Sequence, residues 1–196
     1  EIERVLKGFT GNIEQRPPRY SAVKHRGRAL YRWARAGQPV DAPPRPVKIH
    51  GIALESIELP DVVFQVACSR GTYVRSLCSD VGERLGCGAC LLALRRTKSG
   101  PFDEPMAVSL DDGEETVLRE RLERKMLTLS EALPGLDHFV VENGLADRLR
   151  RGFQPTAESL AGKEIPSLAA GDVIKLITCD FKLVALARMI RSSGAA

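Results

Sequence analysis

Alternating side chains between residues 47 and 68 predict two adjacent β-strands. The second, residues 62–68, is apolar at six of its seven positions, so we expect most of both its faces to be covered. Pro60 and Asp61 predict the turn between the strands, and Gly51 predicts an irregularity in the first one, residues 47–59. The pattern therefore predicts a β-hairpin that leads directly into residues 69–75.

A helix should follow the second strand after a tight Ser-Arg-Gly turn. Its apolar positions recur at helical spacing, and Gly86 is a suitable C-terminal cap. They are Val74, Leu77, Cys78, Val81 and Leu85. Tyr73 and Arg75 lie two residues apart, and an extended strand end would project both to the same side, which predicts a site there. The alternative is a half-buried aromatic beside an ordinary surface charge.

Further elements are predicted along the chain with less regular patterns. Helices are expected at residues 1–8, 28–36, 111–126 and 144–151, and strands at 139–141, 173–178 and 183–187. Residues 89–97 predict a short apolar strand that runs into Arg95 and Arg96, and so reaches a surface cleft. The first helix has no capping residue ahead of Glu1, so we expect a segment to precede it.

Composition and charge indicate a soluble protein with a basic half. The hydrophobic content is 43%, and neither a run of about 20 apolar residues nor a signal-peptide pattern is present, so we expect a cytoplasmic protein. Residues 1–100 hold 17 Lys and Arg against 9 Asp and Glu, whereas residues 101–196 hold 12 against 16. The densest part, residues 16–35, has seven cations and no acid, interleaved with Tyr20, Tyr31 and Trp33. Cations that follow phosphates and aromatics that stack on bases suit RNA, although a solvated helix face is an equally good interpretation.

Five cysteines in a chain without an export signal predict free thiols in a reducing compartment. Cys87 and Cys90 have the spacing of half a zinc site or of a redox pair, but no second pair of cysteines or histidines lies at a matching separation. We therefore expect no metal site.

Several motifs, in order, resemble the bacterial tRNA pseudouridine-55 synthases of the TruB family. The upstream ones are Gly11–Gln15 with Pro17-Pro18, Tyr20–Lys24 and Gly27–Tyr31. The downstream ones are Cys68–Arg75, Asp80–Glu83, Leu85–Ala89 and Leu94–Thr97. The resemblance implies an α/β (α+β) fold: a pseudouridine-synthase catalytic-domain portion with a mixed or antiparallel sheet and helices at residues 1–136. A small β-rich, PUA-like RNA-binding domain is expected at residues 137–196.

The resemblance also implies a reaction and roles for residues. The reaction is isomerisation of the T-loop uridine at position 55 of tRNA to pseudouridine, by a monomer that binds the T-arm and needs no metal, organic cofactor or membrane. Arg75 corresponds to the arginine that pairs with the catalytic carboxylate, Tyr73 to the tyrosine beside the reacting base, and Leu94 to an apolar wall of the pocket.

The expected RNA contacts are Arg70, Arg95, Arg96, Lys24 and Tyr20, although surface salt bridges would explain the cations equally well. The family's catalytic Asp and a second tyrosine belong to blocks that these 196 residues do not contain, and Asp41, Asp61 and Asp80 do not match that Asp. We therefore expect the isolated chain to be inactive. The alternative is a non-catalytic RNA-binding fragment.

Overall fold

The chain divides into two compact units, which are described separately. The computed structural model describes residues 1–110, 114–156 and 169–190. The units are Glu1–Arg95 and Arg96–Ala196. The predicted domain boundary after residue 136 stays a prediction.

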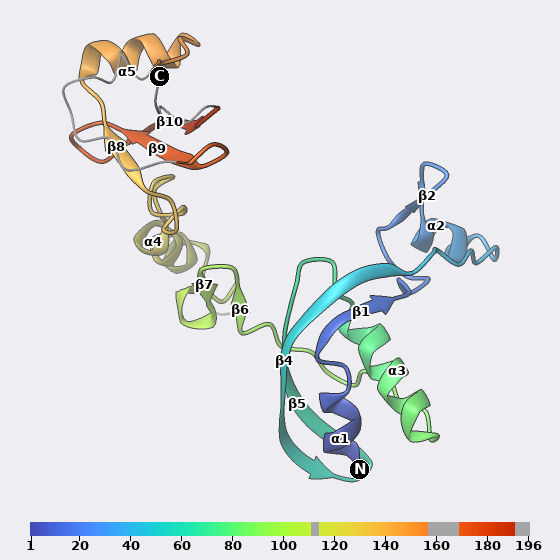
Figure 1. The fold of residues 1–196 in the computed structure, drawn as a ribbon. Helices are drawn as coiled ribbons and strands as arrows, with labels where there is room; N and C mark the ends of the chain where they lie inside the picture. Colours follow the sequence, from blue (N-terminus) through green and yellow to red (C-terminus); the bar gives the residue numbers. More distant parts are fainter. Residues whose placement is uncertain (111–113, 157–168, 191–196) are drawn as a thin grey trace. The chain divides into compact units, whose positions relative to one another are not determined.

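The first unit is built on a three-stranded antiparallel sheet with two helices on one face (Figure 1). Its main elements are α1 (Ile2–Lys7), β1 (Gly11–Gln15), β4 (Arg45–Glu58), β5 (Asp61–Cys68) and α3 (Val74–Leu85). The strand order is β1-β4-β5, so the predicted hairpin of β4 and β5 is confirmed. Its turn is Leu59-Pro60 and not Pro60-Asp61 as predicted, because Asp61 pairs with Glu58. The register shifts between Ile49 and Gly51, which confirms the predicted irregularity.

Only one face of this sheet is covered, which corrects the expectation for β5. Phe64 and Val66 pack with Leu6 of α1 and Leu77 of α3 in one core. On the opposite face Val63 remains 48% exposed. Apolar side chains on both faces of β5 misled the prediction, because α1 and α3 both lie on the same side and no element of the first unit covers the other.

Helix α3 follows its predicted course and carries a tightly packed glycine. It ends at Gly86, whose φ of 79° is the left-handed conformation of a C-terminal cap. A Cβ on Gly82 would lie 2.1 Å from the backbone nitrogen of Ala89, so the 86–90 turn folds directly onto the helix. The Gly88 N–H also donates to the Gly82 carbonyl at 3.0 Å.

The chain beyond this turn is not the predicted buried strand. Residues 88–97 form no helix or strand, and Leu92 and Leu94 are 82% and 61% exposed. A strand needs a partner for its backbone N–H and C=O groups, and no described strand pairs with this segment. Its apolar side chains therefore stay at the surface.

Between β1 and β4 lies a small basic segment of the first unit, residues 16–44. It contains a two-stranded ladder and the helix that had been predicted to begin at residue 28: β2 (Lys24–His25), β3 (Arg28–Ala29) and α2 (Leu30–Arg35). The helix begins two residues later than expected because Arg28 and Ala29 pair with β2.

The second unit holds the short elements predicted for the C-terminal part. They are α4 (Glu115–Lys125), β8 (His138–Val140), α5 (Asn143–Arg150), β9 (Val173–Ile177) and β10 (Leu183–Arg188). Before them lie three short elements that were not predicted: β6 (Lys98–Ser99), β7 (Phe102–Asp103) and a 3-10 turn (Glu104–Met106). Residues 111–113 of the predicted 111–126 helix lie outside the described residues.

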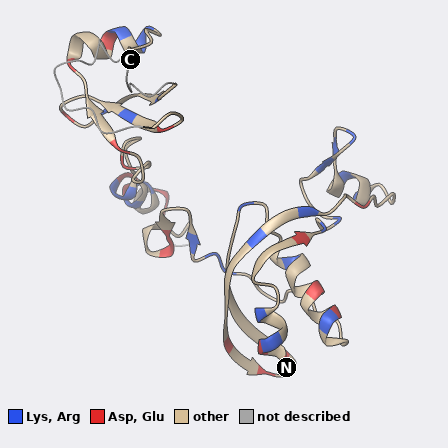
Figure 2. Cartoon of the chain, viewed as in Figure 1, with Lys and Arg blue, Asp and Glu red and all other residues tan. Residues whose placement is uncertain are grey.

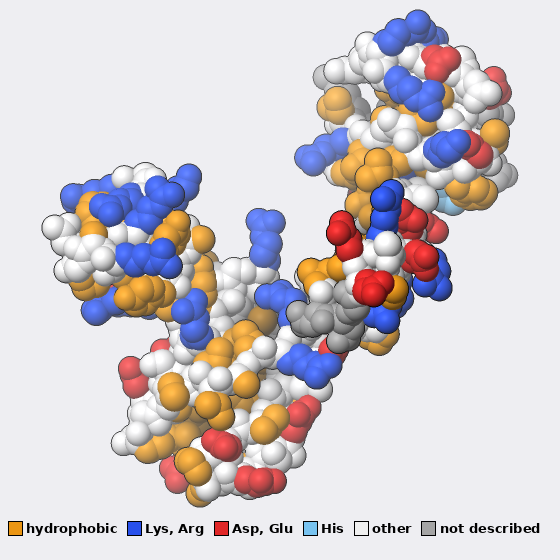
Figure 3. All heavy atoms as spheres, turned by 180° about the vertical axis from the view of Figure 1, so that it is seen from behind, with side chains coloured by type: hydrophobic (Ala, Val, Ile, Leu, Met, Phe, Trp, Pro, Cys, Tyr) orange, Lys and Arg blue, Asp and Glu red, His pale blue; other side chains and the backbone are white. Residues whose placement is uncertain are grey.

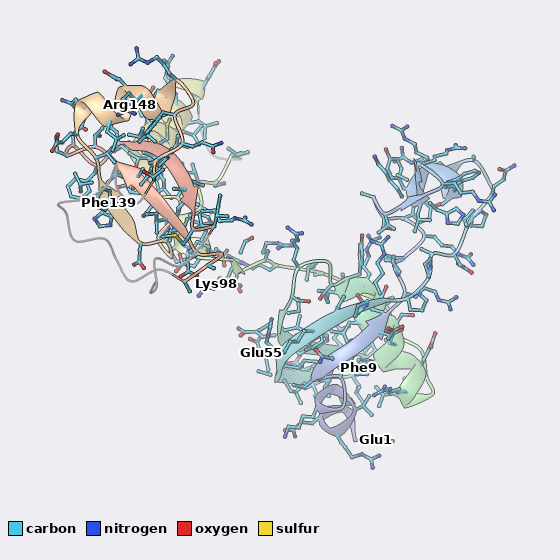
Figure 4. All side chains as sticks on the ribbon, turned by 45° about the horizontal axis from the view of Figure 1, so that its top comes forward. Glu1, Phe9, Glu55, Lys98, Phe139 and Arg148 are labelled. Carbon is cyan, nitrogen blue, oxygen red and sulfur yellow. The ribbon has the colours of Figure 1, made fainter. Side chains whose placement is uncertain are left out.

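The second sheet has the order β10-β9-β8, with β8 parallel and β10 antiparallel to β9. Phe139 of β8 packs in one core with Leu176 of β9 and Leu149 of α5; Figure 4 labels Phe139 on the strand and Arg148 on the helix. Lys175 is buried, and its Nζ donates to the carbonyls of Ser130 and Leu133 at 3.2 and 3.0 Å. The predicted α/β (α+β) class with mixed and antiparallel sheets is therefore confirmed.

Candidate functional site

The strand–turn–helix from β5 to α3 is fixed by its own hydroxyl groups. The Ser69 hydroxyl accepts from the Lys48 N–H at 2.9 Å, and the Thr72 hydroxyl donates to the Ser69 carbonyl at 2.9 Å. Gly71 makes the turn with a φ of 91°, where a side chain would be strained. These contacts hold Tyr73 in an extended conformation immediately before α3.

Gln15 holds Tyr73 from the neighbouring strand. Its side chain is 2% exposed, and its amide bonds both backbone groups of Tyr73. The Tyr73 N–H donates to Oε1 at 2.7 Å, and Nε2 donates to the Tyr73 carbonyl at 3.0 Å. The sequence analysis assigned Gln15 no role, although its alternation with Ile13 indicated that it shares the inward face of β1.

Arg75 lies in the first turn of α3 and not on a strand end, which corrects the geometry expected for the Tyr73–Arg75 pair. One of its guanidinium N–H groups donates to the Tyr20 carbonyl at 2.9 Å. The adjacent Ser76 hydroxyl donates to the Arg16 carbonyl at 2.9 Å. Together with Gln15, these bonds fasten the extended 15–20 segment along the start of α3.

A cavity of about 310 Å³ opens beside Tyr73. Its lining residues come from β1, the 17–23 segment, the start of β4 and the 70–73 turn: Gln15, Pro17, Val23, Arg45, Pro46, Val47, Arg70, Gly71 and Tyr73. The lining contains two arginines and, within the described part of the chain, no carboxylate. The cavity therefore favours an anion with an apolar or flat portion.

The other predicted RNA contacts are dispersed. Arg70 lines the cavity, whereas Leu94 and Arg95 lie in the exposed 88–97 segment. Arg96 begins the second unit, whose placement relative to the first is not defined. Lys24 is exposed on β2, and Tyr20 is 59% exposed. Of the predicted contacts within the first unit, Arg70 alone lines the cavity, together with Tyr73.

Arginine guanidinium groups lie over two of the three aromatic rings in the basic segment, those of Tyr31 and Trp33. The Arg28 guanidinium lies 4.7 Å from the Trp33 ring centre, and Arg35 lies 5.5 Å from that of Tyr31. Tyr20 makes no such contact among the described residues and offers a free face to a base. Lys and Arg nevertheless gather on this part of the first unit, as Figure 2 and the space-filling view of Figure 3 show.

Nothing described suggests a metal site or a membrane span. Within residues 1–110, 114–156 and 169–190, no three His, Cys, Asp or Glu side chains are grouped to hold a metal ion. Burial raises the pKa of the Cys78 thiol, and the nearby Cys90 thiol adds to the effect, which lowers its reactivity. No helix in the described part has the length and apolar character needed to cross a bilayer.

Comparisons with known proteins agree with this arrangement. Residues 1–74 match the model of the TruB family pseudouridylate synthase N-terminal domain, and residues 75–160 match that of the tRNA pseudouridylate synthase B C-terminal domain. A tRNA pseudouridine synthase B from Syntrophus aciditrophicus is 48% identical over 98% of this chain and 62% of that protein. One from Geobacter sulfurreducens is 41% identical over 90% of this chain and 58% of that protein.

Solved structures with the same fold include chains from two larger assemblies. A Cbf5 complex with Nop10 and Gar1 aligns at a TM-score of 0.66 and 30% identity, over 97% of this chain and 55% of the matched chain. An H/ACA ribonucleoprotein bound to a substrate RNA aligns at 0.66 and 25% identity, over 98% and 54%. The chain thus spans about three fifths of the curated relatives it matches. It belongs to the TruB family of pseudouridylate synthases.

Proposed function

We propose that this chain is the base-positioning and RNA-binding part of a tRNA pseudouridine synthase, active on the T-loop uridine at position 55. The observation that carries the proposal is the fixed position of Tyr73, which Gln15 clamps at the edge of a cavity flanked by arginines. The family membership and the names of the relatives support the same reaction. The protein acts on the T-arm as a cytoplasmic monomer without a cofactor.

The reaction replaces the N1–C1′ bond of uridine with a C5–C1′ bond. The base must first leave its stack, which costs a few kcal/mol and is offset by contacts in a fitted pocket. Tyr73 supplies a flat surface beside the extruded base. The family motif assigns Leu94 to an apolar wall of that pocket, although here the side chain is 61% exposed and outside the cavity lining. Arg95, Arg96 and Lys24 contact phosphates.

Arg75 has the donors to hold a catalytic carboxylate. A guanidinium carries five N–H donors, and among the described residues Arg75 uses one of its own, toward the Tyr20 carbonyl. The remaining donors suit a paired, charge-assisted contact that keeps an Asp ionised and oriented. That Asp lies outside these 196 residues, because neither the cavity lining nor the family motifs of this chain contain it.

The first test is to incubate the 196-residue chain with unmodified tRNA. We expect tRNA binding without pseudouridine, because losing a nucleophile or general base removes the chemical step. The protein from the complete reading frame should convert the T-loop uridine. Conversion by the 196-residue chain would refute the placement of the Asp, and no conversion by either protein would favour the alternative of a non-catalytic RNA-binding module.

The role of Arg75 is tested in the longer protein. Arg75→Lys keeps the charge but loses the paired geometry, and Arg75→Ala loses both. Both should lower the single-turnover rate, Ala more than Lys, while the tRNA binding free energy changes by less than about 1.4 kcal/mol. Weaker binding with an unchanged rate at saturating tRNA would instead make Arg75 a phosphate contact.

A further inference from the structure

Two arginines at the cavity beside Tyr73 have no side-chain partner among the described residues. Arg45 begins β4, where it stands opposite Gln15 in the ladder with β1, and Arg70 lies in the turn after β5. We infer that Arg45 and Arg70 form a phosphodiester-binding subsite, which grips the RNA backbone next to the base held at Tyr73. This inference rests on the proposed function in taking RNA as the ligand.

Several other arginines of the first unit contact neighbouring side chains. Arg19 pairs with Asp41 at 3.3 Å, Arg28 stacks on Trp33, and Arg84 lies 4.1 Å from the ring centre of Phe9. In contrast, the side chains of Arg45 and Arg70 make no hydrogen bond, ion pair or ring contact with any described residue. Two cations on one cavity repel each other, so an anion between them is stabilised by both.

The remaining lining indicates which anion fits. Pro17, Val23 and Val47 give the cavity apolar walls, which suit a ribose or a base more than a bare inorganic ion. Guanidinium forks match the two free oxygens of a phosphodiester in geometry and charge. A volume of about 310 Å³ is at the small end for ligand pockets, which fits one nucleotide unit.

Sequence and fold each contribute one half of this subsite. Arg70 lies in the Ser-Arg-Gly turn, and its side chain had been predicted to contact phosphate. Arg45 follows a proline-rich stretch with no motif of its own, and only the pairing of β4 with β1 brings it to the same cavity. The subsite therefore joins segments that lie 25 positions apart along the chain.

The test measures binding of a five-nucleotide uridine RNA to the 196-residue chain, beside the same oligonucleotide with uncharged methylphosphonate linkages. Arg45→Gln and Arg70→Gln should each weaken binding of the natural RNA several-fold at low salt. Each should also reduce the slope of log K against log salt by about 0.7, the value for one single-strand phosphate. Arg4→Gln is the matched control, because it removes one exposed charge from α1 of the same unit. It should change neither quantity.

The subsite would be refuted if wild type, Arg45→Gln and Arg70→Gln bound the natural RNA equally well. It would also be refuted if wild type bound the methylphosphonate RNA as tightly as the natural RNA, or if wild type bound neither RNA. Fluorescence of Trp33, the single tryptophan, checks that each variant is folded. Failure here is distinct from failure of the proposed function, because pseudouridine formation by the longer protein is scored separately.

Discussion

Gly82→Ala should destabilise the first unit although alanine is the better helix former. Gly82 lies inside α3, where replacing Gly by Ala in open space gains about 1 kcal/mol. Here the new Cβ would lie 2.1 Å from the Ala89 nitrogen, 2.3 Å from the Gly88 carbonyl carbon and 2.6 Å from the Ala89 Cβ. Two of these contacts are with backbone atoms, so no rotamer change relieves them.

The expected change in the free energy of unfolding combines two destabilising contributions and one stabilising contribution. Overpacking typically costs about 1–3 kcal/mol, and displacing the turn also loses the Gly88-to-Gly82 hydrogen bond, worth about 1 kcal/mol. After the helix gain is subtracted, we expect a net loss of about 1–3 kcal/mol in the free energy of unfolding. The displaced turn would carry the following 88–97 segment with it, and so shift Leu94.

The assay is urea unfolding followed by helical circular dichroism, with Trp33 fluorescence to identify the first unit. Gly144→Ala is the matched control, because Gly144 lies in α5 with nothing within 4 Å of an added Cβ. The control should be stabilising by up to about 1 kcal/mol. Combining Gly82→Ala with Ala89→Gly should recover only part of the loss. A Gly82→Ala protein as stable as wild type would refute the packing argument.

Two further predictions concern hydrogen bonds. Gln15→Leu leaves the Tyr73 N–H without its partner, while the Tyr73 carbonyl still accepts from the Leu77 N–H at 3.1 Å. The change should therefore cost about 1–3 kcal/mol in urea unfolding, whereas Gln65→Leu on the exposed face of β5 should cost little; similar losses in both would contradict the role of Gln15. The Lys182 and Thr178 hydrogen bonds lower the pKa of Asp180 to about 2, so its ionised form stabilises the fold above the unfolded value of about 3.9. The difference in the free energy of unfolding between wild type and Asp180→Asn should therefore decrease as the pH falls from about 4 to about 2. A difference that does not depend on pH would refute the role of the Asp180 carboxylate.

Local patterns were enough for the elements whose stability is local. The apolar stripe of α3 and its capping Gly86 predicted that helix within a residue, because spacing and a left-handed cap are properties of neighbouring positions. The β4–β5 hairpin was predicted for the same reason, since a two-residue turn sets its register. The family motifs similarly placed Tyr73 at the turn from β5 into α3.

Other features depended on partners distant in sequence, which no local pattern encodes. An apolar run at residues 89–97 predicts a strand whether or not another strand pairs with it. In the structure no described strand pairs with this run, so Leu92 and Leu94 are exposed. In the sequence, Gln15 is an ordinary polar residue. Tertiary packing places its amide against the backbone of Tyr73, 58 positions away. The sequence by itself thus determined the family, the helices and the hairpin. The tertiary structure decided which face of the sheet is covered, what holds Tyr73 and which cations remain unpaired, because each of these depends on contacts between distant segments.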